Sequence, residues 1–254
     1  MDFLLASGLD TTHTLLLIIA AGFTSFLTSA VGIGGGVLLL AIMASIVPVS
    51  ALIPVHGLVQ LGSNGNRAFM TRRHIDWSML KFFCIGAVAG AAVASLVVVQ
   101  LPLMVIQLAV AGFILFLVWG PKPPNRDMSN RGRMAAGAVT TFITMFVGAT
   151  GPLVAGFVHR NNYDKLKLTS TFAACMTFQH SLKALVFTAV GFAFWQWLPL
   201  TLAMIASGSA GTWLGLKVLN RIPAEHFKLA FKVIVTLMAL KLLWQALRPV
   251  LLPA

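Results

Sequence analysis

Residues 28–40 read Thr28-Ser-Ala-Val-Gly-Ile-Gly-Gly-Gly-Val-Leu-Leu-Leu40. They lie inside an apolar segment, residues 12–47, that is longer than one membrane crossing requires, because a helix crosses about 30 Å of hydrocarbon in about 20 residues. Glycine tolerates backbone angles that other residues avoid, so this cluster predicts a break in the helix. A second run, Val147-Gly-Ala-Thr-Gly-Pro152, predicts a matching break inside residues 134–158.

The composition predicts an all-α polytopic membrane protein. Apolar residues make up 58% of the chain, charged residues 9%, and the mean hydropathy is +0.91. A soluble domain needs more charged surface than this, and in lipid the backbone amides must be satisfied within their own segment, which favours helices. The net charge of +12 is concentrated in short loops, where it sets membrane orientation, so no nucleic-acid partner is expected.

The chain divides into two similar halves. Each half contains one broken apolar segment followed by three unbroken ones, and we interpret this order as an internal duplication. The predicted divisions are a first membrane repeat over residues 1–119, a cytoplasmic linker over 120–133 and a second membrane repeat over 134–254. The unbroken segments are residues 49–70, 78–99 and 102–119 in the first half and 168–192, 198–219 and 227–247 in the second.

Loop charges predict that the repeats have opposite orientations. Positive charge in the loop after residues 49–70, in the linker and in the loop after residues 134–158 places all three in the cytoplasm. Each broken segment then enters and leaves on the same side as a re-entrant hairpin, and three transmembrane helices follow it. This arrangement is an inverted-topology repeat. The alternative is that each broken segment crosses once, which gives eight spans and parallel repeats.

The two breaks are candidate binding positions for an anion. A short helix restarts after each break, near Gly36 and at Pro152, and a helix N-terminus presents free N–H groups with a positive partial charge. Two such ends facing each other near the middle of the membrane would attract an anion. The alternative is that both breaks are packing points between helices.

Polar residues within the apolar segments extend this candidate site. His56, Gln60 and Asn64 share one helix face with Arg67, which we expect near the cytoplasmic interface. The matching segment of the second half carries Gln179, His180 and Lys183. Charges at membrane depth are costly, so Lys183 is predicted to serve the substrate. The two histidines either contact substrate or pack as hydrogen-bonded residues.

The acidic residues exclude other classes of site. All six Asp and Glu residues lie near the termini or in loops, so no metal site, cofactor or cation pathway is expected. The sequence contains no HExxH motif, no GxSxG motif and no paired acids, which disfavours an enzyme.

The two glycine-containing runs resemble those of the TauE/SafE family of sulfite and sulfonate exporters, and the resemblance covers roughly residues 12–247. It implies transport of sulfite, of C2 sulfonates such as sulfoacetate, or of related carboxylates across a bacterial inner membrane. By motif position it points to Gly34, Gly35, Gly36, Gly151 and Pro152. One departure is Pro54-Val-His-Gly57, where the family carries an Ala-Thr-Ser pattern.

These observations predict a secondary transporter whose partners are a small anion and the lipid bilayer. The inside-negative potential contributes about 2.3 kcal/mol per charge per 100 mV, which makes anion export downhill and favours export by alternating access. The sequence leaves two other functions open: an anion channel, and a membrane enzyme or assembly factor.

Overall fold

The computed structural model describes residues 8–31, 34–97, 103–121, 128–159, 161, 163–219 and part of 233–251. Within these residues the chain is helical and contains no strand, which confirms the predicted all-α class. The predicted helix over residues 227–247 lies largely outside them. The helices are α1 (Thr11–Val31), α2 (Gly35–Met43), α3 (Val49–Met70), α4 (Trp77–Ser95), α5 (Leu103–Trp119), α6 (Asn130–Val147), α7 (Gly151–His159), α8 (Lys165–Ala189) and α9 (Leu198–Val218).

Polar side chains cap four of the helices that the structure describes, and the first cap is Asp10, which accepts a hydrogen bond from the His13 N–H at the start of α1. Asp76 accepts a hydrogen bond from the Met79 N–H at the start of α4, and Asp164 accepts one from the Lys167 N–H at the start of α8. Ser129 caps α6 in the same way. Each cap satisfies one of the N–H groups that the first turn of a helix leaves without a partner.

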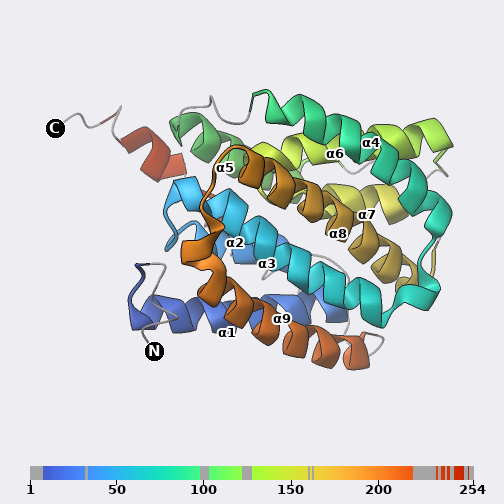
Figure 1. Cartoon of the computed structure of the whole chain (residues 1–254), viewed down its shortest axis with the longest axis horizontal. Helices are drawn as coiled ribbons and strands as arrows, with labels where there is room; N and C mark the ends of the chain where they lie inside the picture. Colours follow the sequence, from blue (N-terminus) through green and yellow to red (C-terminus); the bar gives the residue numbers. More distant parts are fainter. Residues whose placement is uncertain are drawn as a thin grey trace.

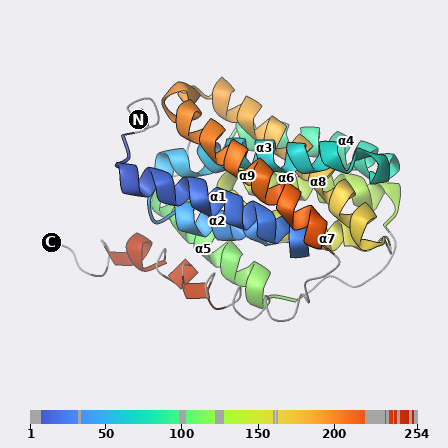
Figure 2. The ribbon, with the colours of Figure 1, turned by 90° about the horizontal axis from the view of Figure 1, so that it is seen from below.

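Helices α3 and α8 pack against each other in the centre of the molecule and run antiparallel (Figures 1 and 2). The pair α1 and α9 lies on one side of this centre, and the pair α4 and α6 lies on the other. Helix α9 also contacts α3, and α4 also contacts α8, so the central helices are held from both sides.

Glycines bring both outer pairs into direct backbone contact. A Cβ atom at Gly86 of α4 would lie 1.8 Å from the Met134 carbonyl oxygen of α6. A Cβ atom at Gly90 would lie 2.1 Å from the Ala138 carbonyl oxygen. In the other pair, a Cβ at Gly211 of α9 would lie 2.0 Å from the Gly22 carbonyl oxygen. Small residues are the usual means of such close contact between helices in membranes.

Both short helices turn back along the helix that precedes them. A Cβ atom at Gly35 would lie 1.9 Å from the Thr24 carbonyl oxygen, so the start of α2 packs directly on α1. At the second break, Arg133 near the start of α6 donates to Asn161, which follows α7, with a Nη2–Oδ1 distance of 3.3 Å. The end of α7 therefore lies beside the beginning of α6.

Helix α1 buries several polar residues among its small and apolar ones, and it exposes large apolar residues. Its buried residues include Thr24, Ser25 and Thr28, whereas Ile19 and Phe23 are 67% and 56% exposed. A soluble protein shows the opposite preference, and a helix in lipid shows this one. Among the described helices, Thr11–Val31 and Trp77–Ser95 have the length and hydropathy to cross a membrane, with mean values of 2.0 and 1.6.

Candidate functional site

A small cavity lies where the two breaks meet helices α3 and α8. Its volume is about 20 Å³, which is room for about one water molecule. Most of its wall comes from the helix restarts and from one face each of α3 and α8. The lining residues are Thr28, Gly34, Gly36, Val37, His56, Gln60, Asn64, Ala149, Gly151, Pro152, Phe172, Met176 and His180.

The N-terminus of α2 reaches the cavity without a side-chain cap. Gly34 has a φ of 107°, a left-handed conformation that favours glycine, and its carbonyl oxygen accepts from the N–H groups of Val37 and Leu38. Gly35 and Gly36 are the first two residues of α2, and an α-helix offers no internal acceptor for the N–H groups at these positions. The restart therefore presents donors and the positive end of a helix dipole.

The N-terminus of α7 has a similar construction. Gly148 ends α6 with a φ of 83°, and α7 begins three residues later at Gly151. Pro152 fits the first turn because its missing N–H would have no acceptor there. The Thr150 hydroxyl does not cap this helix, since it donates to Gln179 Oε1 at 2.9 Å.

The two predicted histidines meet at the cavity. Each is 1% exposed, and their ring centroids lie 6.3 Å apart in an edge-on arrangement. His56 Nε2 donates to the Gly36 carbonyl oxygen at 2.9 Å. Neither ring nitrogen of His180 has a hydrogen-bond partner among the described residues. A buried polar group normally has one, so His180 marks a position where a ligand group is expected.

An amide pair from α3 forms the adjacent wall. Asn64 Nδ2 donates to the side-chain oxygen and to the carbonyl oxygen of Gln60, at 3.0 and 2.9 Å. Arg67 donates to Asn64 Oδ1 from Nη1 and to Ser29 Oγ from Nε. Arg67 is 1% exposed and bonded to side chains of α1 and α3, and its expected position near the cytoplasmic interface stays a prediction.

Three residues of the predicted site lie away from the cavity wall. Gly35 packs against α1, and Gln179 is fully engaged with the hydroxyl groups of three threonines. Lys183 is fully buried and donates to the Gly148 carbonyl oxygen at 2.7 Å and to Thr144 Oγ1 at 2.9 Å. Gln179 and Lys183 support the second break from behind.

Sequence reasoning did not select five of the lining residues. Phe172 and Met176 precede His180 by eight and four residues, so helical periodicity alone could have placed them on its face. Thr28, Val37 and Ala149 adjoin the two breaks. Their small or apolar side chains carried no separate chemical signal.

The charge around the cavity is positive. No acidic residue is among the described residues that line it, and the nearest charged groups on α3 and α8 are the buried Arg67 and Lys183. Buried cations without paired carboxylates are costly, and a bound anion offsets part of that cost. The electrostatics of the site therefore favour anions.

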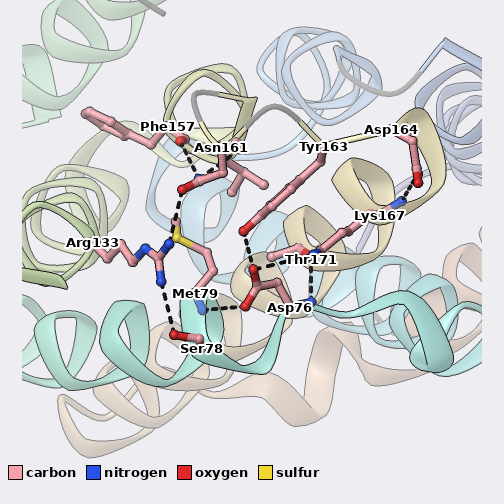
Figure 3. Close-up of polar contacts among 11 residues, drawn as sticks. Asp76, Ser78, Met79, Arg133, Phe157, Asn161, Tyr163, Asp164, Lys167 and Thr171 are labelled. Carbon is pink, nitrogen blue, oxygen red and sulfur yellow. Dashed lines mark hydrogen bonds and ion pairs between the residues drawn. The ribbon is translucent and has the colours of Figure 1, made fainter. Parts of the chain in front are cut away.

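A separate polar cluster joins the two halves at the end of the molecule where the basic loops meet (Figure 3). The Asp76 carboxylate accepts hydrogen bonds from the Tyr163 hydroxyl and the Met79 N–H, and it lies 3.8 Å from Lys167 Nζ. The Asp76 N–H donates to Thr171 Oγ1 at 2.9 Å. The start of α4 is thus bonded to the start of α8 and to the loop before it.

These contacts shift the pKa of both acidic groups in the cluster. Burial disfavours the charged form of Asp76, but the hydrogen bonds from Tyr163 and Met79 and the charge of Lys167 outweigh it and lower the Asp76 pKa. Burial, followed by the hydrogen bond to Asp76 and the Asp76 charge, raises the pKa of Tyr163. The cluster therefore holds an ionised carboxylate and a neutral phenol at neutral pH.

The family model for the sulfite exporter TauE/SafE matches residues 17–242. The chain belongs to this family, whose members are membrane transporters and not enzymes. The resemblance seen in the two glycine-containing runs is therefore confirmed. No curated protein and no solved structure is significantly similar to the chain.

Proposed function

We propose that this protein is a secondary transporter that binds sulfite or a small sulfonate such as sulfoacetate in the cavity between the N-termini of α2 and α7. The observation that carries the proposal is His180, a buried imidazole on the cavity wall whose two nitrogens have no partner among the described residues. An oxyanion would accept from His180 and from the first-turn N–H groups of both short helices.

The field at the cavity suits this substrate class. Two helix N-termini and two buried cations are close to it, and its described lining contains no carboxylate. Gly36, Gly151 and Pro152 keep the approach to both helix ends open because none has a large polar side chain. The proposed site comprises Gly34, Gly35, Gly36, His56, Gln60, Asn64, Gly151, Pro152, Gln179, His180 and Lys183, with Gly35, Gln179 and Lys183 acting from behind the wall.

The same proposal includes an inverted-topology repeat. In this repeat α1 corresponds to α6, and α4 corresponds to α9. Exchange of the two halves therefore converts the pair α1 and α9 into the pair α6 and α4, which are the two tightly packed outer pairs. The exchange also swaps α3 with α8, which run antiparallel, so it requires an axis in the membrane plane. These contacts support two re-entrant hairpins, α1–α2 and α6–α7, that meet near the middle of the bilayer.

Transport would occur by alternating access in a bacterial inner membrane. A cavity of about 20 Å³ is smaller than a sulfonate requires, so one helical group must move against the other to admit substrate. The membrane potential favours outward movement of an anion, which supports export.

The test is substrate-dependent charge movement in proteoliposomes that contain the full chain. Sulfite, sulfoacetate, taurine, acetate and sulfate are added in turn to wild type, to His180→Leu and to Trp213→Leu, a control with an exposed side chain on α9. We expect a saturable signal for one or two sulfur anions that is lost in His180→Leu and kept in the control. Silence for every anion in folded protein would reject the transporter. A signal that His180→Leu leaves unchanged would reject the site.

The same measurement separates a transporter from an anion channel. Alternating access predicts a flux that saturates with substrate concentration and supports exchange across the membrane. A channel predicts much larger currents that rise with concentration without exchange. The narrow cavity favours the transporter.

A further inference from the structure

A chain of hydrogen bonds leads from Arg67 to the cavity wall. Arg67 Nη1 donates to Asn64 Oδ1 at 3.2 Å, and Asn64 Nδ2 donates to Gln60 Oε1 at 3.0 Å. Arg67 does not line the cavity, whereas Asn64 and Gln60 do. The Gln60 side-chain amide lies against the start of α2, where a Cβ atom at Gly36 would be 3.3 Å from Gln60 Oε1 and 3.4 Å from Gln60 Nε2.

The direction of every bond in this chain is determined. A guanidinium group donates and never accepts, so Asn64 must present its oxygen to Arg67. The Asn64 nitrogen, Nδ2, lies 2.9 Å from the backbone carbonyl oxygen of Gln60, which can only accept a hydrogen bond. Both partners thus require the same orientation of Asn64. Its second N–H then requires Gln60 to turn Oε1 toward it.

The remaining group of Gln60 is its Nε2, which donates to no described residue. We propose that Arg67 is a positioning residue that orients the Gln60 amide through Asn64, so that Gln60 Nε2 donates to the anion in the cavity. This inference rests on the proposed anion site. It makes Gln60 a specificity-determining ligand for a group that accepts hydrogen bonds.

The alternative orientation of Gln60 would act against an anion. Without the chain, the amide can rotate so that Oε1 faces the cavity, and the oxygen repels a negatively charged ligand. The second half holds its amide differently. Gln179 accepts from Thr150 and donates to Thr140 and Thr141, so it has no donor left for substrate. The orienting chain therefore belongs to α3.

The experiment is a double-mutant cycle on the affinity for sulfite, measured by titration calorimetry on the full chain in detergent. The variants are Gln60→Met, Arg67→Met, their combination, and Arg67→Lys, which keeps a donor-only cation. Ser63→Ala is the matched control, because Ser63 is a buried α3 residue bonded to Ser25 and does not line the cavity. Unfolding temperature is measured for every variant.

We expect Gln60→Met and Arg67→Met each to weaken sulfite binding about tenfold, the size of a hydrogen bond to a charged group. In the Gln60→Met background, Arg67→Met should cause a much smaller further loss of affinity, the part that the positive charge of Arg67 contributes, although it still lowers the unfolding temperature. Arg67→Lys should restore most of the binding, and Ser63→Ala should leave it unchanged. Such coupling between the two positions isolates positioning from a general effect on folding.

An equal loss from Arg67→Met in both backgrounds would overturn the inference, because it would show that Arg67 acts only through its charge or through the fold. If Arg67→Met does not fold, Asn64→Leu breaks the same chain and enters the same cycle with the same criteria. Wild type that binds no sulfite would instead reject the proposed function, so the two failures are distinct.

Discussion

The Nζ atom of Lys183 lies 2.7 Å from the Gly148 carbonyl oxygen, and this contact places a buried cation at the C-terminus of the broken helix α6. Helix C-termini carry a negative partial charge, so the lysine stabilises the end of α6. The positive end of α7 begins three residues further on, at the cavity. Lys183 therefore cancels the unfavourable end of one helix and leaves the favourable end of the next free to attract an anion.

Replacement of Lys183 by Met should destabilise the protein and weaken anion binding. The Gly148 carbonyl and the Thr144 hydroxyl would each lose a charged donor but keep their hydrogen bond to each other, so we expect a cost of about 1.5–3 kcal/mol, the size of a hydrogen bond to a charged group. Thermal unfolding in detergent, with and without sulfite, measures both effects. The control is Lys217→Met, since Lys217 is exposed and packs over Trp213. Equal effects of the two variants would contradict the assigned role.

The position of Lys183 also depends on a glycine in the opposing helix. A Cβ atom at Gly57 would lie 2.6 Å from Lys183 Cδ, so the lysine crosses α3 only because residue 57 has no side chain. Gly57→Ala should move Lys183 away from Gly148 and reproduce much of the loss seen in Lys183→Met. Gly65→Ala is the matched control in the same helix, because its Cβ would meet only Thr177 at an ordinary 3.7 Å. Sulfite affinity that is unchanged in Gly57→Ala would show that Lys183 can shift without consequence.

The Asp76 cluster predicts a loss of stability in acid. The folded-state pKa of Asp76 is below the ordinary value of an aspartate. The ionised carboxylate therefore stabilises the fold at pH values above the ordinary pKa, and this stabilisation is lost as pH falls through the folded-state pKa. The difference in unfolding temperature between wild type and Asp76→Asn should therefore shrink as pH falls from neutrality into this acidic range. A difference that is constant with pH would show that Asp76 acts only as a helix cap.

Tyr163→Phe tests the same cluster from the other side. Removal of the hydroxyl takes away one of the hydrogen bonds that favour the Asp76 carboxylate, so the pKa of Asp76 should rise. The acid-induced loss of stability should then begin at a higher pH than in wild type. Asp164→Asn is a useful comparison, because Asp164 also caps a helix but does not belong to the contact with Tyr163. Identical acid profiles of Tyr163→Phe and wild type would exclude this coupling.

The sequence predicted the breaks and the polar faces of α3 and α8 because those features are local. A glycine cluster in an apolar run and a spacing of three or four residues require no knowledge of the partner helix. His56, Gln60, Asn64 and His180 were selected in this way, and the structure places them on one cavity.

The burial of Arg67 was not predicted because its partners are remote. Its position before an arginine-rich loop is typical of an interfacial residue, and nothing local indicates that Ser29 of α1 accepts from it. The contact of Lys183 with Gly148 was missed for the same reason, since it joins residues 35 positions apart. A single sequence places a polar residue on a helix face, but the tertiary fold decides whether that residue meets ligand or backbone.

Gly86→Ala should destabilise the protein without changing the site. The added Cβ would lie 1.8 Å from the Met134 carbonyl oxygen, and because this obstacle is backbone, α4 and α6 must separate. Overpacking of this kind costs about 1–3 kcal/mol, which thermal unfolding in detergent resolves. Gly112→Ala in α5 provides the control, since its Cβ would meet nothing within 4 Å and alanine favours helix over glycine. Neither residue lines the cavity, so the sulfite affinity of the folded fraction should be unchanged in both variants. A weaker affinity in Gly86→Ala at full folding would mean that the spacing of α4 and α6 controls the cavity as well as the stability.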